Sequence, residues 1–195
     1  NIDVEVGGGI RNYEDIEDLI KEGLLQIPDK IQELLENKEQ FEEIAKLLKD
    51  EEDLFFLGRG IDYALALEGS LKLKEVSYIH SEAYAGGELK HGTIALIEPG
   101  TKVIALLTQE KLREKMVSNV VEVKARGAYV IGLAYEGDQL DSSVFDKVIT
   151  IPRVSNRVAT IPAAVALQLL AYYTAKEKGC DIDKPRNLAK SVTVE

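Results

Sequence analysis

Apolar positions along the chain fall into two patterns, short continuous runs and longer stretches with a helical period. The continuous runs suit strands that are buried on both faces of a parallel sheet. Such runs lie at 54–57, 102–107, 128–134 and 147–151. The pattern therefore predicts four buried strands.

Helical stretches separate these runs, and strands that alternate with helices indicate right-handed crossovers. Pro28 suits the first turn of a helix, so we expect one helix to end before it and another to begin there. The predicted helices lie at 13–25, 28–49, from the turn at 58–60 to about 79, 109–126 and 160–178. Together these elements predict an α/β domain with a central parallel sheet between helical layers.

The helix that follows Gly60 carries three charged residues in one narrow sector, Glu68, Lys72 and Glu75. Most of its other positions are apolar, which is typical of a buried helix. Buried charges are costly unless they pair or bind a ligand, and active sites accept that cost to tune proton transfer. The alternative is a half-exposed helix with an ordinary ion pair, and the helix pattern leaves both interpretations open.

Two glycine-containing turns lie where ligands could approach. The turn at 85–92 combines glycines, charges and His91, which suits a polar surface close to a ligand or a neighbouring chain. The turn at 58–60 ends a predicted strand, and ligands of open α/β sheets sit beyond the carboxyl ends of strands. A purely structural turn would also explain its glycines.

Composition narrows the class of protein. The 195 residues are 45% hydrophobic, enough for one sizeable core, and carry a net charge of −10. The negative charge argues against nucleic acid as a partner. The sequence shows no membrane span or signal peptide, and the single Cys180 allows no internal disulfide. These features predict a protein of the reducing cytoplasm without a membrane partner.

The last residues, 181–195, show no helical or strand period, and Pro185 interrupts them. Such a tail is usually frayed, and its residues alone favour that interpretation. The alternative is a lid that folds over a site and delivers Lys190 to it.

Two long motifs identify a family. Residues 66–92 (ALEGSLKLKEVSYIHSEAYAGGELKHG) and residues 183–195 (DKPRNLAKSVTVE) closely resemble the isomerase region of the glucosamine-6-phosphate synthases, or glutamine:fructose-6-phosphate aminotransferases. The resemblance runs from about residue 24 to the last residue. It implies a sugar-isomerase (SIS) domain with a flavodoxin-like αβα sandwich. The implied organisation is an unassigned arm at 1–23, the SIS domain at 24–180 and a catalytic tail at 181–195.

The resemblance also implies a reaction, the conversion of fructose 6-phosphate and glutamine-derived ammonia to glucosamine 6-phosphate. Enzymes of this family carry two SIS domains and a glutaminase domain, and this sequence resembles only the second SIS domain. The first SIS domain and the glutaminase domain are therefore expected partners, and the isolated chain is expected to have little or no activity. A homodimer is expected, and no cofactor or metal ion is implied.

Site residues follow from the motif by position. Glu75 matches the glutamate that moves a proton between C1 and C2 of the sugar, and Lys72 matches a lysine that contacts the substrate. Glu68 matches a substrate-site glutamate that holds this lysine. His91 matches the histidine that opens the sugar ring, which in this family comes from the neighbouring subunit.

The resemblance changes the interpretation of the tail. Lys190 matches the lysine that forms a Schiff base with the open-chain ketose, and Ala189 beside it belongs to the substrate site. The turn at 58–62 lacks the hydroxyl groups with which the first SIS domain grips phosphate, so we do not expect it to bind phosphate in that way. A non-catalytic SIS module that binds sugar phosphates is the alternative function, and the matched Glu75, His91 and Lys190 favour the enzyme.

Overall fold

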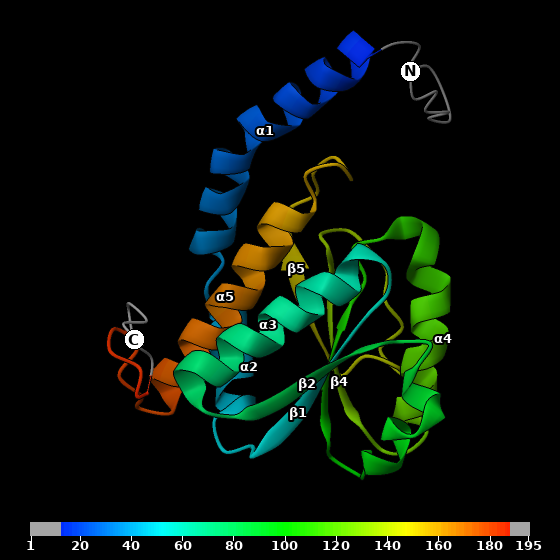
Figure 1. Cartoon of the computed structure of the whole chain (residues 1–195), viewed down its shortest axis with the longest axis vertical. Coiled ribbons are helices and arrows are strands. Elements are labelled where there is room, and N and C mark those ends of the chain that lie inside the picture. The colour runs from blue at the N-terminus through cyan, green and yellow to red at the C-terminus, as the bar shows by residue number, and fades with distance from the viewer. Residues whose placement is uncertain (1–12, 188–195) are drawn as a thin grey trace, which may run out of the picture.

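The structure, a computed structural model, describes residues 13–187, and its centre is a parallel sheet (Figure 1). The strands are β1 (Asp53–Gly58), β2 (His80–Ala85), β3 (Lys102–Leu106), β4 (Tyr129–Tyr135) and β5 (Lys147–Ile151). Their order is β2-β1-β3-β4-β5, and every neighbouring pair is parallel. This is the strand order of flavodoxin-like doubly wound sheets. The predicted fold class is therefore confirmed.

Helices cover both faces of the sheet. They are α1 (Tyr13–Glu36), α2 (Glu39–Leu48), α3 (Ile61–Ser77), α4 (Arg113–Lys124) and α5 (Thr160–Glu177), with short 3₁₀ turns η1 (Leu89–His91), η2 (Thr93–Leu96) and η3 (Glu110–Leu112). Helix α5 packs against α3 and α2 on one face of the sheet, whereas α4 lies on the other (Figure 1). The first part of α1 extends beyond the sandwich.

Two hydrophobic clusters fill the space between these layers. One lies between the sheet and α2, α3 and α5, and it includes Phe41, Phe56, Leu73 and Leu167. The other lies between the sheet and α4, and it includes Met116. Because alternate residues of each inner strand enter opposite clusters, these strands read as continuous apolar runs in the sequence.

The prediction that Pro28 begins a helix is wrong. Helix α1 continues through Pro28 to Glu36, and the chain breaks only at Asn37 and Lys38. A proline inside a helix removes a single backbone hydrogen bond, which the surrounding turns tolerate here. The later break lets Gln40 reach β5, where its side chain donates to the Thr150 oxygen at 3.1 Å and accepts from the Thr150 nitrogen at 2.8 Å.

Strand β2 was missing from the prediction, which treated this part of the chain as the approach to a turn. It is an edge strand, paired only with β1, so much of its surface remains accessible. Ser81 is its only buried residue. An edge strand needs no continuous apolar run, and the sequence HSEAYA carries none.

Candidate functional site

The three charged residues of α3 form one connected strip. Lys72 Nζ lies 2.8 Å from Glu75 Oε2 and 3.8 Å from Glu68 Oε1, because side chains three and four residues apart share a helix face. The side chains of Glu68, Lys72 and Glu75 are 41%, 32% and 28% exposed. In this chain the strip is therefore half-exposed, which agrees with the interpretation of a half-exposed helix that carries an ordinary ion pair.

The pairing fixes the protonation state of the lysine. Its hydrogen bond to Glu75 raises the pKa of Lys72, although partial burial opposes the effect. Lys72 therefore remains an ammonium group at neutral pH and donates to Glu75. It can bind a negatively charged or carbonyl group, whereas it is not a base at this pH.

Apolar side chains flank the charged strip. Leu67 and Leu71 of α3 are 47% and 44% exposed, and Tyr172 of α5 is exposed as well. Leucines of a buried helix would normally be covered, so this face suits contact with another protein surface. Covering the face would also bury the strip and strengthen its electrostatic interactions.

His91 lies in the turn that follows β2, at the carboxyl edge of the sheet. The turn is held by a hydrogen bond of 2.9 Å from the Gly86 nitrogen to the Gly58 oxygen, and by Leu89, which is buried in the second cluster. Arg59 Nε donates to Asn119 Oδ1 at 2.9 Å and connects the neighbouring turn to α4. The anchored turn leaves His91 exposed.

The structure does not bring His91 and Glu75 together. Helix α3 begins beside the carboxyl edge of the sheet, and Glu75 lies fourteen residues beyond Ile61, about 21 Å along the helix axis. Glu75 is therefore near the opposite, amino edge. A site that uses both residues requires His91 from another copy of the chain.

The crevice at the carboxyl ends of β1 and β3 is occupied by the protein itself. Asp62 is buried there, where it accepts hydrogen bonds from the Thr108 nitrogen at 2.9 Å, the Gln109 nitrogen at 3.3 Å and the Thr108 hydroxyl. Burial raises the pKa of Asp62, and these hydrogen bonds oppose the rise. The backbone donors that an anion could use at this point already serve the Asp62 carboxylate.

Backbone geometry explains why glycine occupies positions 58 and 60 beside this site. A Cβ on Gly58 would lie 2.2 Å from the backbone oxygen of Asp62, and Gly60 has a φ of 59°. The first position needs close backbone approach and the second a left-handed conformation. The turn at 58–60 is thus accounted for without a ligand.

The tail residues Ala189 and Lys190 lie outside the described residues, but the chain leading to them is described. After α5 it passes the C-terminal end of α3, as Figure 1 shows. Cys180 Sγ lies 3.9 Å from the Ser77 oxygen, in agreement with a packing role for this cysteine. The Arg186 nitrogen donates to Tyr78 Oη at 2.9 Å. The described residues from Cys180 to Arg186 therefore lie at the end of α3 that carries Glu75.

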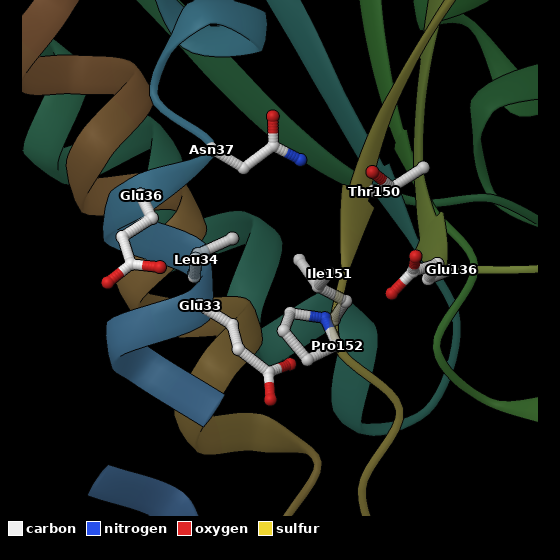
Figure 2. Close-up of a pocket in the computed structure, with 8 residues that line it drawn as sticks. All are labelled: Glu33, Leu34, Glu36, Asn37, Glu136, Thr150, Ile151 and Pro152. Atoms are coloured by element: carbon white, nitrogen blue, oxygen red, sulfur yellow. The ribbon is translucent and has the colours of Figure 1, made fainter. Parts of the chain in front are cut away.

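A cavity of about 300 Å³ between α1 and the end of β5 lies apart from the predicted site residues (Figure 2). Glu33, Glu36 and Glu136 contribute carboxylates to its lining, as Figure 2 shows, and none of its lining residues is basic. Negative charge would repel a phosphate group. The cavity is therefore unsuited to a sugar phosphate.

The described residues offer neither a metal-binding cluster nor a membrane-spanning helix. Between residues 13 and 187 no group of three or more His, Cys, Asp or Glu side chains is placed to hold a metal ion. None of the helices described there has the length and apolar character needed to span a membrane.

Comparison with known proteins gives consistent results. The SIS domain family matches residues 47–176. The glutamine–fructose-6-phosphate aminotransferase (isomerising) of Caldanaerobacter subterraneus subsp. tengcongensis is 55% identical over 194 residues, covering 100% of this chain and 32% of that protein. The enzyme of the same name from Clostridium tetani is 57% identical over 187 residues, covering 96% of this chain and 31% of the relative. The chain thus spans about a third of the length of the curated relatives that it matches.

Solved structures show the same likeness. The C-terminal domain of glucosamine-fructose-6-phosphate aminotransferase from Francisella tularensis has a TM-score of 0.76 at 36% identity, covering 84% of this chain and 46% of that one. The tagatose-6-phosphate ketose/aldose isomerase of Escherichia coli has a TM-score of 0.58 at 18% identity, covering 74% of this chain and 40% of that one, which supports the fold alone. The sheet order, the family match and these likenesses agree, and the chain belongs to the SIS domain family.

Proposed function

We propose that this chain is the second sugar-isomerase domain of a glutamine–fructose-6-phosphate aminotransferase, which converts fructose 6-phosphate and ammonia from glutamine to glucosamine 6-phosphate. The observation that carries the proposal is the Glu68–Lys72–Glu75 strip of α3, together with the contact of Arg186 with Tyr78 at the end of that helix. The 55% identity to enzymes of that name supports the same reaction.

Each group of the strip has a chemical role in this proposal. Glu75 transfers the proton between C1 and C2 of the open-chain sugar, for which a positioned carboxylate is suited. Lys72, charged and bonded to Glu75, binds a substrate oxygen, and Glu68 restrains the lysine from the preceding turn. Lys190 attacks the ketose carbonyl to form a Schiff base with loss of water, and Ala189 contacts the substrate beside it.

His91 opens the sugar ring in a site of a second copy. Glu75 lies about 21 Å along α3 from Ile61, which is beside the carboxyl edge of the sheet where His91 lies, and this supports a site shared between two copies. The proposal therefore includes a homodimer. It also includes the first SIS domain, which would supply the phosphate-binding loop, and a glutaminase domain as the source of ammonia.

The non-catalytic sugar-phosphate-binding module is not favoured. The Asp62 carboxylate already accepts from the backbone nitrogens of Thr108 and Gln109 at the carboxyl edge of the sheet, so these donors are not available to a phosphate group. The domain limits at 23 and 180, the cytoplasmic location, the low activity of the isolated chain and the lack of nucleic-acid or membrane partners stay predictions.

The test is Glu75→Gln in a full-length synthase that carries this domain. The change keeps the size of the side chain and removes its ability to accept a proton, so we expect isomerisation to fall about 10²- to 10⁴-fold. Glu114→Gln, an exposed residue on α4, is the matched control and should retain full activity. Equal activity of the two variants would refute the role of Glu75.

A further inference from the structure

Tyr78, which directly follows α3, has a backbone conformation that its side chain does not favour. Its φ is 62°, in the left-handed region that usually holds glycine or asparagine at the end of a helix. Among the described residues only Asn187 shares this feature outside glycine. A bulky residue with positive φ carries a conformational cost, which contacts of its side chain can offset.

The aromatic ring and the hydroxyl group of Tyr78 both contact Arg186. The guanidinium carbon lies 4.2 Å from the centre of the ring, a cation–π distance, and the Arg186 nitrogen donates to Tyr78 Oη at 2.9 Å. Asparagine or glycine at position 78 would retain the helix end but lose both contacts. One side chain thus holds both the backbone and the side chain of Arg186.

Arg186 and Tyr78 are close in sequence to two predicted catalytic residues. Glu75 precedes Tyr78 by three residues, about 5 Å along the helix axis. Lys190 follows Arg186 by four residues, which span at most about 14 Å. An anchor at Tyr78 therefore limits how far the Lys190 amine can move from the Glu75 carboxylate.

From this geometry we infer that Tyr78 and Arg186 form a clamp that positions the tail so that Lys190 meets the substrate beside Glu75. Both are positioning residues, because they act through Lys190 and not on the sugar. The inference rests on the proposed function, in which Lys190 forms the Schiff base.

The described residues before the clamp, 181–185, form a turn that leads the chain to Arg186. Asp181 Oδ1 accepts from the nitrogens of Asp183 and Lys184, which makes a compact turn before Pro185. Proline then restricts the backbone immediately before the clamp. Residues 181–186 are thus held by this turn and by the contact with Tyr78.

The experiment measures how fast borohydride traps fructose 6-phosphate on Lys190 in a full-length synthase that carries this domain. Tyr78→Asn removes both contacts and suits the left-handed backbone, so we expect trapping about tenfold slower with an unchanged or higher melting temperature. Tyr78→Phe keeps the ring and should slow trapping about threefold. Tyr129→Phe, which alters another ring beside a cation, is the control and should trap at the original rate.

A double variant separates a clamp from two independent effects. If the residues act as a pair, Tyr78→Asn combined with Arg186→Ala should be no slower than the slower single variant. Trapping at the original rate in Tyr78→Asn, or multiplied losses in the double variant, would overturn the clamp. Absence of a Lys190 adduct in the unaltered synthase would instead overturn the proposed function.

Discussion

Lys72 and Tyr135 are two polar residues that differ in exposure and in hydrogen bonding. Lys72 is half-exposed and paired with Glu75, so its charge is retained for use at the surface. Tyr135 is buried, and its hydroxyl oxygen has no hydrogen-bond partner within the described residues. Burial, reinforced by the charge of Asp62, raises the pKa of Tyr135 to about 12.

Tyr135→Phe should increase the stability of the domain. The change removes an unsatisfied hydroxyl group and keeps the ring, so we expect the free energy of unfolding at pH 7 to rise by about 1 kcal/mol. Urea unfolding of the two proteins measures the difference. A loss of stability would show that the hydroxyl group makes a favourable contact.

Tyr135→Phe also tests how the stability of the domain depends on pH. Below pH 10 the phenol is protonated in both states, whereas between pH 10 and about 12 the unfolded chain loses its proton first. Deprotonation then favours unfolding, so the original protein should lose stability over this range relative to Tyr135→Phe. Parallel stability curves for the two proteins from pH 9 to 12 would contradict the assignment.

The connection from β1 to α3 is the element on which the site depends, because it sets the direction of the helix that carries Glu75. Gly58 and the first turn of α3 are in close backbone contact, with 2.2 Å between a built Cβ and the Asp62 oxygen. Gly58 cannot move without displacing strand β1, and the first turn of α3 cannot move without displacing that helix. The connection therefore has little tolerance for a larger residue.

Gly58→Ala should destabilise the domain by about 3 kcal/mol or more, since the clash is with backbone atoms. Gly137→Ala is the control. Its φ of 84° carries a conformational cost of about 1–2 kcal/mol, but no atom lies near the new methyl group. Chemical denaturation compares the two, and equal losses would show that the predicted clash relaxes.

At the scale of elements the sequence predicted the interior better than the edges. The inner strands β1, β3 and β4 carry continuous apolar runs because both of their faces are buried, and these runs predicted them. The predicted strand at 147–151 is β5, an edge strand in which Ile149 and Ile151 are the buried residues. The other edge strand, β2, carries no such signal because its sequence, HSEAYA, has no continuous apolar run. Pro28 was misjudged because local preference indicates a helix start there, whereas the contact of Gln40 with β5, which fixes the real break, is long-range.

In the candidate site, too, local features could be predicted from the sequence and long-range contacts could not. Spacing alone placed Glu68, Lys72 and Glu75 on one face of α3, and the structure confirms this grouping. The contact of Tyr78 with Arg186 joins positions 108 residues apart, which no local pattern reveals. The separation of His91 from Glu75 also depends on the fold, since only the antiparallel course of α3 against the strands puts them at opposite edges.

For the whole molecule, the proposed function implies that a complete site needs more than one copy of this chain. In a dimer each site would combine Glu75 of one copy with His91 of the other. Variants that lack one residue each can then complement one another, because a mixed dimer retains one intact site.

Co-expression of Glu75→Gln and His91→Ala full-length synthases should therefore restore about a quarter of the original activity, if the copies associate at random. Each variant alone, and a protein with both changes in one chain, should remain inactive. Restored activity close to zero in verified mixed dimers would place Glu75 and His91 of the same chain in one site.

The exposed leucines of α3 suit contact with another domain, which would complete the site. Leu67 and Leu71 border the charged strip, so a surface that covers them would also enclose Glu75 and Lys72. We expect the first SIS domain to provide that surface. This chain would then contribute reactive groups to a site that it does not enclose.

The most direct test of the central claim is borohydride trapping with fructose 6-phosphate, followed by mass mapping of the adduct, on this chain alone and with the first SIS domain restored. We expect an adduct on Lys190 in the restored protein and little or none in the isolated chain. An adduct on Lys190 in the isolated chain would show that this domain holds substrate by itself. An active restored protein without an adduct on Lys190 would contradict the assignment of the tail lysine as the nucleophile.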